Sequence, residues 1–468
     1  MNLEPMHLDD RRPTHRSDRL CIRGARVLTL DGAGTQWPCA DVVIEAGRIV
    51  AIGPQASRDR PPADRVVEAD GLLAMPGLIN GHFHSPGNLM KGVLPGLPLE
   101  LFMLHEVPPL AQGGDAARLA YLRTMVGALE MLRRGVTAVH DDAYHVPVAD
   151  TTGIDAIMHA YRDAGLRATV AIDQPNVVEY AKYPYLAELL PEDERRAMDA
   201  APRQDTATLL GLYHHLIERW HGAEDGRLRA AVSCSALQRV TPDYLEALSA
   251  LSRRHDLAFN VHVLETRLQR VLGEQRWGHS PVRQLRETGV LDERMTVIHA
   301  IWVDDTDIRL LADSGCTVAH APVCNLRLGS GEMPWRALHD AGVPVCLGSD
   351  EMNTDDSVNL WFVAKTAALI HTLSGPDPER WPRPDEVLRA ATAGGARAMR
   401  SDGEFGVLRV GGCADLVLLD LDTVSFTPLN DLCRQLVMCE DGRSVVTTVV
   451  DGRIVFEAGR ITTVDEPA

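Results

Sequence analysis

The sequence PGLINGHFHS, at residues 76–85, decides the fold of this chain. It follows the mostly apolar run at 71–75 and contains two histidines, His82 and His84, that are separated by one residue. In a β-strand, side chains two residues apart point to the same face, so both imidazoles can reach one metal ion. Two partly exposed strand histidines would give the same pattern. This stretch alone leaves both interpretations open.

The chain around this stretch alternates short apolar runs with helical patterns. After the strand that carries His82 and His84, seven further runs have strand character, at residues 136–140, 168–172, 228–232, 258–262, 295–299, 317–320 and 343–350. Helices are expected between them, for example at 116–134 and 304–314. This alternation is typical of βα units with a parallel sheet. It predicts an α/β fold in which residues 73–403 form a (β/α)8 TIM barrel.

The two ends of the chain show short strands and tight turns instead. Ala46-Gly47 inside the strand-like run 41–52 predicts a hairpin, and the sequence GRIV occurs at 47–50 and again at 452–455. We therefore expect residues 19–72 and 404–468 to form one small β-sandwich-like domain, although two unrelated hairpins would also fit. The polar residues 1–18 are expected to be a disordered tail.

Composition limits the partners and the location of the protein. The 468 residues have room for a barrel and a smaller domain. Formal charge is −18, which argues against nucleic acid or an anionic membrane as partner, because both require a basic surface. The nine cysteines contain no C-x-x-C pair, which favours free thiols in a reducing compartment. With no run that resembles a signal peptide or a membrane span, a cytoplasmic protein is expected.

Residues that bind metals or move protons stand at the ends of the predicted strands. His262, His299 and Asp350 join His82 and His84 at these positions, which converge at one mouth of a barrel. Four of these residues offer donor atoms that suit Zn²⁺ or Fe²⁺, with water completing the coordination sphere of the metal. They are His82, His84, His262 and Asp350. Such residues at several strand ends are hard to attribute to chance. The pattern favours one metal site over separate structural histidines.

Three residues are candidates for catalysis. Glu265 comes three residues after His262, where it could move a proton from a metal-activated water to a leaving nitrogen. An exposed loop carboxylate would be the alternative for Glu265. His299 is expected to contact the attacking water or the developing oxyanion, and Asp350 to accept the water's proton as well as to bind metal. The metal would make hydroxide available at neutral pH.

Together these motifs resemble the amidohydrolase superfamily, in the branch of cytosine, guanine, S-adenosylhomocysteine and triazine aminohydrolases. The motifs are PGLINGHFH at 76–84, HVLE at 262–265, IHA at 298–300, AHAPVCNLRLGSG at 319–331 and GSD at 348–350. The resemblance covers nearly the whole chain, including a β domain split between the termini. It implies a mononuclear site with the four ligands named above, and Glu265, His299 and Asp350 as the proton-transfer set. It also implies a homodimer or larger homo-oligomer.

The number and kind of metal ions follow from the same resemblance. Binuclear relatives carry a carboxylated lysine at the end of strand 4, and this chain has no lysine there. One divalent ion is therefore expected, with Zn²⁺ first and Fe²⁺, Mn²⁺ or Co²⁺ as alternatives.

The substrate is less well defined. Relatives that deaminate methylthioadenosine and S-adenosylhomocysteine carry a histidine after strand 4, where this chain has Ser235, and an arginine after strand 3, where it continues Asp173-Gln174. An adenosine-type substrate with an anionic tail is therefore less expected. The long connections 86–115 and 174–226 follow strands and are expected to form the lid and specificity elements. The first is largely apolar, which indicates either a small apolar substrate or ordinary core and subunit packing.

Six residues are candidates for substrate binding: Met103, His105, Gln174, Ser235, Asn325 and Glu351. Glu351 either faces the pocket, where it would favour a basic or amide-bearing substrate, or is a solvated loop charge. Asn325 is expected to anchor the loop that runs to Gly331.

Four further polar residues follow strand 2, namely His140, Asp141, Asp142 and His145. One or two of them are expected to form hydrogen bonds to residues of the metal site, and the others to lie on the surface.

The sequence therefore predicts a metal-dependent hydrolase that acts on a C–N bond of a small molecule. Deamination of an amino-heterocycle is the first hypothesis. Hydrolysis of an amide, carbamate or urea, with the same residues attacking a carbonyl, is the alternative. A metal-stabilised binding protein without activity would require the loss of a catalytic position, yet Glu265 and His299 are both present.

Overall fold

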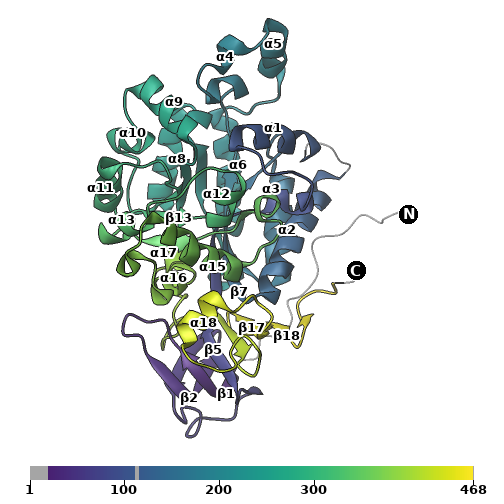
Figure 1. Ribbon diagram of the computed structural model, residues 1–468. Helices are drawn as coiled ribbons and strands as arrows, with labels where there is room; N and C mark the ends of the chain where they lie inside the picture. The colour runs from purple at the N-terminus through teal and green to yellow at the C-terminus, as the bar shows by residue number, and fades with distance from the viewer. Residues whose placement is uncertain (1–18, 111–114, 467–468) are drawn as a thin grey trace.

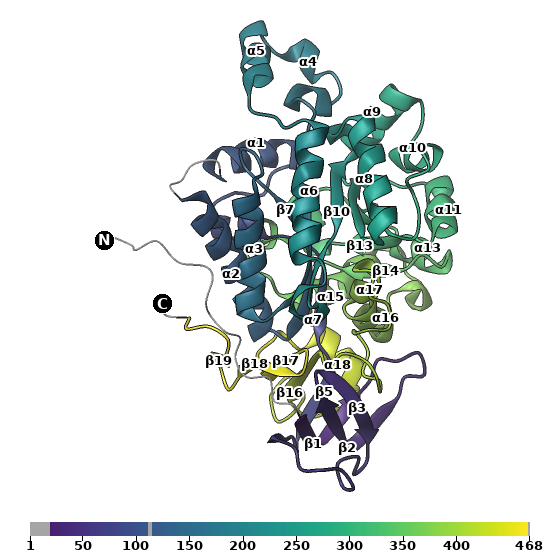
Figure 2. The ribbon, with the colours of Figure 1, turned by 180° about the vertical axis from the view of Figure 1, so that it is seen from behind.

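A computed structural model describes residues 19–110 and 115–466, so the tail expected at 1–18 lies outside the described part of the chain. A sheet built from both ends of the chain lies at one end of the molecule, and helices α4 (Leu186–Leu189) and α5 (Glu192–Ala200) lie at the other (Figures 1 and 2). The parallel strands and most helices occupy the region between them.

The terminal segments contribute to one mixed sheet of nine strands. Its strands are β1 (Arg19–Leu28), β2 (Gln36–Glu45), β3 (Arg48–Gly53), β4 (Arg65–Glu68), β5 (Leu72–Pro76), β16 (Leu416–Asp420), β17 (Val445–Val450), β18 (Arg453–Glu457) and β19 (Arg460–Ile461). The antiparallel pair β5 and β16 joins the two ends of the chain. Between β2 and β3, Ala46 and Gly47 have φ of 46° and 78°, which confirms the predicted tight hairpin turn.

The predicted βα segment forms two parallel sheets of five strands, in the orders β15-β6-β7-β8-β9 and β10-β11-β12-β13-β14. Their strands are β6 (Leu78–His84), β7 (Val136–Tyr144), β8 (Arg167–Asp173), β9 (Leu228–Ala230), β10 (Val232–Ala236), β11 (Phe259–Val263), β12 (Met295–His299), β13 (Thr317–His320), β14 (Val345–Leu347) and β15 (Asp350–Glu351). All the predicted strands are present, and two of them are interrupted.

Both interruptions carry the chain from one sheet to the other. Ala231 separates β9 from β10, and its N–H donates to Val170 of β8, whereas the N–H of Val232 donates to Ala258 just before β11. At the second interruption, the N–H of Gly348 donates to His320 of β13, and Asp350 then pairs with β6. Each interrupted strand therefore changes its neighbour along its length.

Helices surround the parallel strands (Figures 1 and 2). The longer ones are α2 (Ala116–Arg133), α3 (Thr151–Ala164), α6 (Thr206–Trp220), α8 (Pro242–His255), α9 (Arg267–Trp277), α11 (Asp305–Ser314) and α15 (Leu360–Ile370), and the shorter ones include α10 (Pro281–Glu287), α12 (Pro322–Arg327), α13 (Trp335–Asp340), α16 (Pro384–Ala390), α17 (Ala393–Ala398) and α18 (Leu432–Met438). The two ends of α11 show which residues begin and end such a helix. The Asp304 side chain accepts from backbone N–H groups of the first turn, and Gly315 ends the helix at φ 71°.

The two long connections have structure of their own. The first contains the 3-10 helix η1 (Ser85–Met90) and α1 (Leu99–Leu110), and the second contains η2 (Glu179–Lys182), α4, α5, α6 and α7 (Ala223–Gly226). A buried ion pair links the parallel strands to the terminal sheet. Arg167 of β8 donates from Nε and Nη2 to the carboxylate of Asp415, at 2.6 and 3.1 Å, and the N–H of Asp451 donates to the same carboxylate.

Two sequence predictions are tested at this level. The nine cysteines are all unpaired in the structure, as predicted. Within the described part of the chain, no helix is both long enough and apolar enough to cross a membrane.

Candidate metal centre and active site

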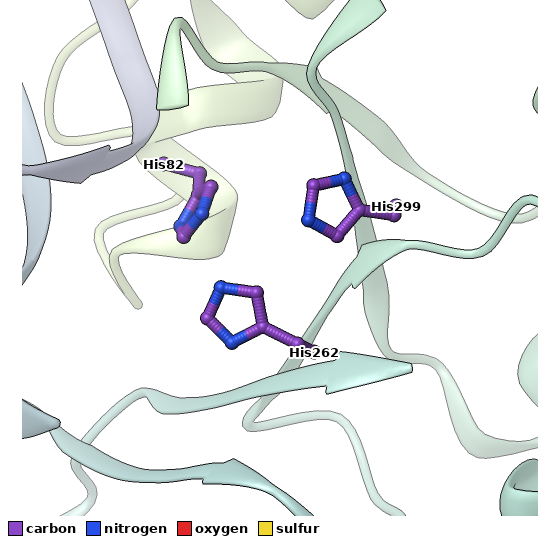
Figure 3. A group of neighbouring side chains, drawn as sticks. All are labelled: His82, His262 and His299. Carbon is purple, nitrogen blue, oxygen red and sulfur yellow. The ribbon is translucent and has the colours of Figure 1, made fainter. Parts of the chain in front are cut away.

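Five polar side chains meet at the ends of the parallel strands. They come from β6 (His82 and His84), β11 (His262), β12 (His299) and β15 (Asp350). Figure 3 shows the rings of His82, His262 and His299 turned toward one another. Nε2 of His84 is 3.2 Å from Nε2 of His262, and Oδ1 of Asp350 is 3.7 Å from Nε2 of both His82 and His84. The predicted strand ends thus converge.

The chemistry of this cluster fits a divalent metal ion. Both ring nitrogens of His82 are buried and have no hydrogen-bond partner among the described residues. Burial, with the neighbouring His84 and His262, holds the pKa of His82 well below its usual range, so the ring is neutral and its lone pair is free. Possible ligand atoms of His82, His84 and Asp350 lie within 4.8 Å of one another. Neutral imidazoles and one carboxylate are the donors that Zn²⁺ and related ions bind.

Hydrogen bonds fix how the histidines face the centre. Nδ1–H of His84 donates to the carbonyl oxygen of Asp142 at 2.5 Å, and Nδ1–H of His262 donates to the carbonyl oxygen of Ser235 at 2.7 Å. Nδ1 of His299 is 2.9 Å from Oδ1 of Asn325. These contacts leave the Nε2 atoms directed at the centre, as is usual for metal-binding histidines.

The backbone around the centre is strained. Several non-glycine residues at the strand ends have positive φ, namely Ser235 (59°), Leu264 (54°), His299 (72°), Ala300 (47°) and Asp350 (60°). L-residues adopt this left-handed region at an energetic cost, and such residues gather where a structure must aim side chains at a functional site. The strain supports a functional role for these strand ends.

The three predicted catalytic side chains lie together. Nε2 of His299 is 3.6 Å from Oε2 of Glu265 and 3.6 Å from Oδ2 of Asp350. Glu265 is 3% exposed, and burial raises the pKa of its carboxyl, although the nearby His299 opposes the rise. A raised carboxyl pKa suits a group that takes up a proton and gives it back.

A cavity of about 460 Å³ opens beside this cluster. Its floor includes His84, His262, Glu265, His299 and Asp350. Both long connections contribute to its walls, through α1 and through the segment that contains η2. Buried titratable groups beside a cavity of this size are typical of an enzyme site for a small molecule.

Residues 73–455 match the amidohydrolase family. The chain belongs to this family. The family predicted from the sequence is therefore confirmed, and the chain is a hydrolase of the amidohydrolase superfamily.

Relatives span almost the whole of this amidohydrolase. The 5-methylthioadenosine/S-adenosylhomocysteine deaminase of Desulforudis audaxviator is 31% identical over 96% of each chain. The 5'-deoxyadenosine deaminase of Methanosarcina mazei is 29% identical over 96% of this chain and 95% of its own length.

Among solved structures, the atrazine chlorohydrolase of Arthrobacter aurescens TC1 complexed with zinc has a TM-score of 0.85 at 28% identity, covering 96% of this chain and 97% of its own. An adenosine deaminase of Xanthomonas campestris with bound zinc has a TM-score of 0.85 at 25% identity, covering 96% and 95%. These likenesses support a divalent metal at the centre.

The predicted substrate-binding residues of this amidohydrolase fall into three groups. Met103, Gln174 and Glu351 line the cavity. Ser235 and Asn325 instead contact the histidines of the floor. The carbonyl of Ser235 accepts from His262, its hydroxyl accepts from Arg239 at 3.0 Å, and the amide of Asn325 contacts His299.

The structure does not bring His105 to the cavity, so its prediction as a substrate contact is wrong. His105 is exposed, whereas Phe102 and Glu106 on the same helix are buried. Side chains four residues apart share a helix face, and the exposed Leu101 lies four residues before His105, so both are on the outward face of α1. Its neighbour Met103 is partly buried and reaches the cavity.

Glu351 is not a solvated loop charge, because only 6% of it is exposed and it lines the cavity. Burial and the adjacent carboxyl of Glu106, to which it is hydrogen-bonded, raise the pKa of Glu351 well above its usual range. Glu106 is held in turn by Tyr144, whose hydroxyl donates to Oε1 at 3.1 Å, and by Nδ2 of Asn353 at 2.5 Å. The cavity wall beside the metal centre therefore contains a pair of carboxyl groups.

The four polar residues after strand 2 are not on the surface, which corrects that part of the prediction. β7 continues to Tyr144, past the predicted end at 140, and runs between β6 and β8. His140 is fully buried, and burial lowers its pKa to about 3. His145 lines the cavity, and burial lowers its pKa to about 4.

Two of these residues support the centre, as predicted for one or two of them. Asp141 accepts from the backbone N–H of Ser85 at 3.0 Å, directly after His84. Asp142 accepts from His84 through its carbonyl. Burial, with the nearby Asp173, raises the pKa of the Asp142 carboxyl well above its usual range.

Sequence reasoning missed three cations that line the cavity, Lys182, Arg203 and Arg239. Arg239 belongs to the 3-10 helix η3 (Leu237–Arg239), which follows β10 directly. Its place just after a strand end was a usable signal, because such positions face the mouth of a barrel. Lys182 belongs to η2, deep in a long connection, and no sequence period indicates where it points.

Proposed function

We propose that this amidohydrolase deaminates an amino-heterocycle by metal-dependent hydrolysis. The observation that carries the proposal is the contact of Glu265 and Asp350 with Nε2 of His299, at 3.6 Å each, on the floor of the cavity. Two carboxyl groups in different environments flank one imidazole there. Together these groups can take a proton from water and give one to a leaving nitrogen. The deaminases among the relatives support the same reaction.

The residues of the centre divide the tasks among them. His82, His84, His262 and Asp350 would hold one divalent ion, which would supply Lewis acidity and make hydroxide available near neutral pH. Asp350 accepts the water's proton, and His299 orients the water and stabilises the developing charge. Glu265 carries the water's other proton to the ring nitrogen, and Asp350 passes its proton to the amino group, which leaves as ammonia. Gln174 and Met103 contact the heterocycle from the walls.

Zn²⁺ is the first choice of metal, because two structural neighbours carry zinc. Fe²⁺, Mn²⁺ and Co²⁺ are the alternatives that the same donor set accepts.

The overall architecture belongs to the same proposal. The strands join into one closed (β/α)8 barrel at residues 73–403, and the segments 19–72 and 404–468 form a separate small domain. The exchange of neighbours at Ala231 and at Gly348 supports this closure.

We also propose a cytoplasmic homo-oligomer, a dimer or larger. The unpaired cysteines fit a reducing compartment. Four apolar side chains in the first long connection and its helix are about half exposed: Leu89, Val93, Leu101 and Leu104. Their exposure favours an interface with another copy of the chain.

One observation favours a second candidate, the hydrolysis of an amide, carbamate or urea. Much of the cavity wall is apolar, with Phe102, Met103 and Leu328 on one side. An aryl or alkyl carbonyl compound could pack against such a wall, and water activated by the same floor residues would attack its carbonyl.

An ammonia-release screen tests the proposal. Zinc-loaded enzyme is incubated with purines, pyrimidines, triazines and pterins that carry an amino group, and in parallel with aryl amides and carbamates. Ammonia from at least one heterocycle is expected. Amine release from the carbonyl compounds alone would overturn the first candidate in favour of the second.

A further inference from the structure

Glu351 is aimed at the cavity by an irregularity in its strand. In a regular strand, consecutive side chains point to opposite faces. Asp350 has φ of 60°, which breaks this alternation, so Asp350 and Glu351 both line the cavity. The register of β15 with β6 places Glu351 directly beside His84. A carboxyl group that the proposed proton transfers do not use therefore stands next to the metal centre.

This carboxyl group has unused hydrogen-bonding capacity. Oε2 of Glu351 is buried and has no hydrogen-bond partner in the described part of the chain, and the same holds for Oε2 of Glu106 behind it. Glu106 cannot turn away, because Tyr144 and Asn353 both donate to its Oε1. A buried acceptor without a donor costs free energy. A ligand that brings a donor to Glu351 removes part of this cost.

The cations that line the cavity have other partners. Nζ of Lys182 donates to Glu179 at 2.5 Å, and Nη1 of Arg239 donates to the hydroxyl of Ser235 at 3.0 Å. Arg203 donates to two backbone carbonyls of α5. Glu179 lies in the second long connection and Ser235 at the end of β10, whereas Glu351 packs with α1 and β6. The wall at Glu351 therefore presents acceptors to the ligand, and the wall at Lys182 and Arg239 presents donors.

We infer that Glu351, held in place by Glu106, selects heterocycles that carry a second N–H donor beside the carbon that is hydrolysed. The inference rests on the proposed function, since it takes the amino-heterocycle as the ligand. A second amino group or a ring N–H would donate to Glu351 while the first amino group leaves. The enzyme would then prefer diamino-heterocycles to monoamino ones.

Matched substrate pairs test this selection. Initial rates are measured with zinc-loaded enzyme on diaminopurine and adenine, and on diaminopyrimidine and aminopyrimidine. The diamino member is expected to have the higher kcat/KM by about 10- to 100-fold, the range for pairing a buried polar group that is otherwise unsatisfied. Glu351→Leu should lower this ratio to about 3-fold or less, since leucine offers no acceptor. Equal kcat/KM on both members, or a ratio that survives in Glu351→Leu, would overturn the inference.

Two controls isolate the effect. Glu293→Leu makes the same change at a carboxylate that is 55% exposed and outside the cavity lining, and it should keep the preference of the wild type. If Glu351→Leu does not fold, Glu106→Gln examines the same point, because Glu106 acts by positioning Glu351. The preference should fall in Glu106→Gln, and an unchanged preference would contradict the inference.

Calorimetric binding separates this inference from the proposed function. If no heterocycle releases ammonia, the proposed function fails. Diaminopurine that binds zinc-loaded wild type more tightly than adenine, and loses this advantage in Glu351→Leu, would still support the role of Glu351. Equal affinity for the two purines in the wild type would reject that role, whatever the turnover.

Discussion

The floor of the cavity and its outer wall are built in different ways. The floor consists of Glu265 and of His84, His262, His299 and Asp350, and these last four lie on parallel strands whose neighbours fix them in register. The outer wall, which includes Met103, Lys182 and Tyr183, comes from helices and turns of the long connections. A strand end can hold an atom in place to within a fraction of an ångström, whereas a connection can change in length and sequence without moving the floor. The chemistry thus depends on the floor, and the selectivity on the wall.

Loss of a floor ligand should have the largest effect. Asp350→Asn removes a charged metal donor and the proposed acceptor of the water's proton. We expect kcat to fall by about 1,000-fold or more, since several kcal/mol of transition-state stabilisation are lost. Metal content, measured by plasma mass spectrometry, should fall from about one ion per chain to a small fraction of that. Chelation of the wild type should abolish activity in the same way, and Zn²⁺ should restore it. Full activity in the chelated protein would refute a metal centre at the floor.

The next effect separates metal binding from proton transfer. Glu265→Gln keeps the size of a side chain that is 3% exposed but removes its ability to carry a proton. Its kcat should fall by about 100- to 10,000-fold, the usual range for general acid–base catalysis. Metal content should stay at the level of the wild type. A variant that holds its metal and keeps full activity would disprove the assignment of Glu265 as proton carrier.

The same contrast explains what the sequence could predict. His82, His84, His262, His299 and Asp350 were identifiable because they lie at the ends of short apolar runs, and parallel strands bring such ends together. The period of two residues along a strand is enough to place His82 and His84 on one face. Glu265 could be assigned because it follows one of these ends by three residues.

The wall was harder to predict for a physical reason. His105 and Met103 belong to one apolar helix, and which of its faces turns inward depends on packing against distant segments. Arg239 and Lys182 reach the cavity through short 3-10 turns that have no hydrophobic period. The burial of Glu351 depends on the left-handed backbone of Asp350, a conformation that no local pattern in an aspartate signals. His140 and His145 were misplaced because β7 extends past its apolar part.

A third prediction concerns the layer that supports the floor. Asn325 of α12 contacts Nδ1 of His299 at 2.9 Å and so sets the orientation of the ring. Asn325→Ala should lower kcat by about 10- to 100-fold, as is usual for partners that orient site histidines, with a smaller change in KM. Asn325→Asp is the matched variant, because it keeps an acceptor for Nδ1–H and should recover much of kcat. If alanine and aspartate have the same effect, Asn325 acts through packing and not through His299.

The smallest effect is expected on the wall. Met103 of α1 lines the cavity, and Met103→Ala removes apolar contact that substrate and transition state share. KM should therefore rise by about 3- to 30-fold while kcat stays within about twofold, because uniform binding affects KM alone. Leu101→Ala is the matched control, since Leu101 lies on the same helix but is 49% exposed and outside the cavity lining. It should leave both constants unchanged. A fall in kcat for Met103→Ala with KM unchanged would mean that α1 positions the reacting atoms, and the separation between a chemical floor and a selective wall would no longer hold.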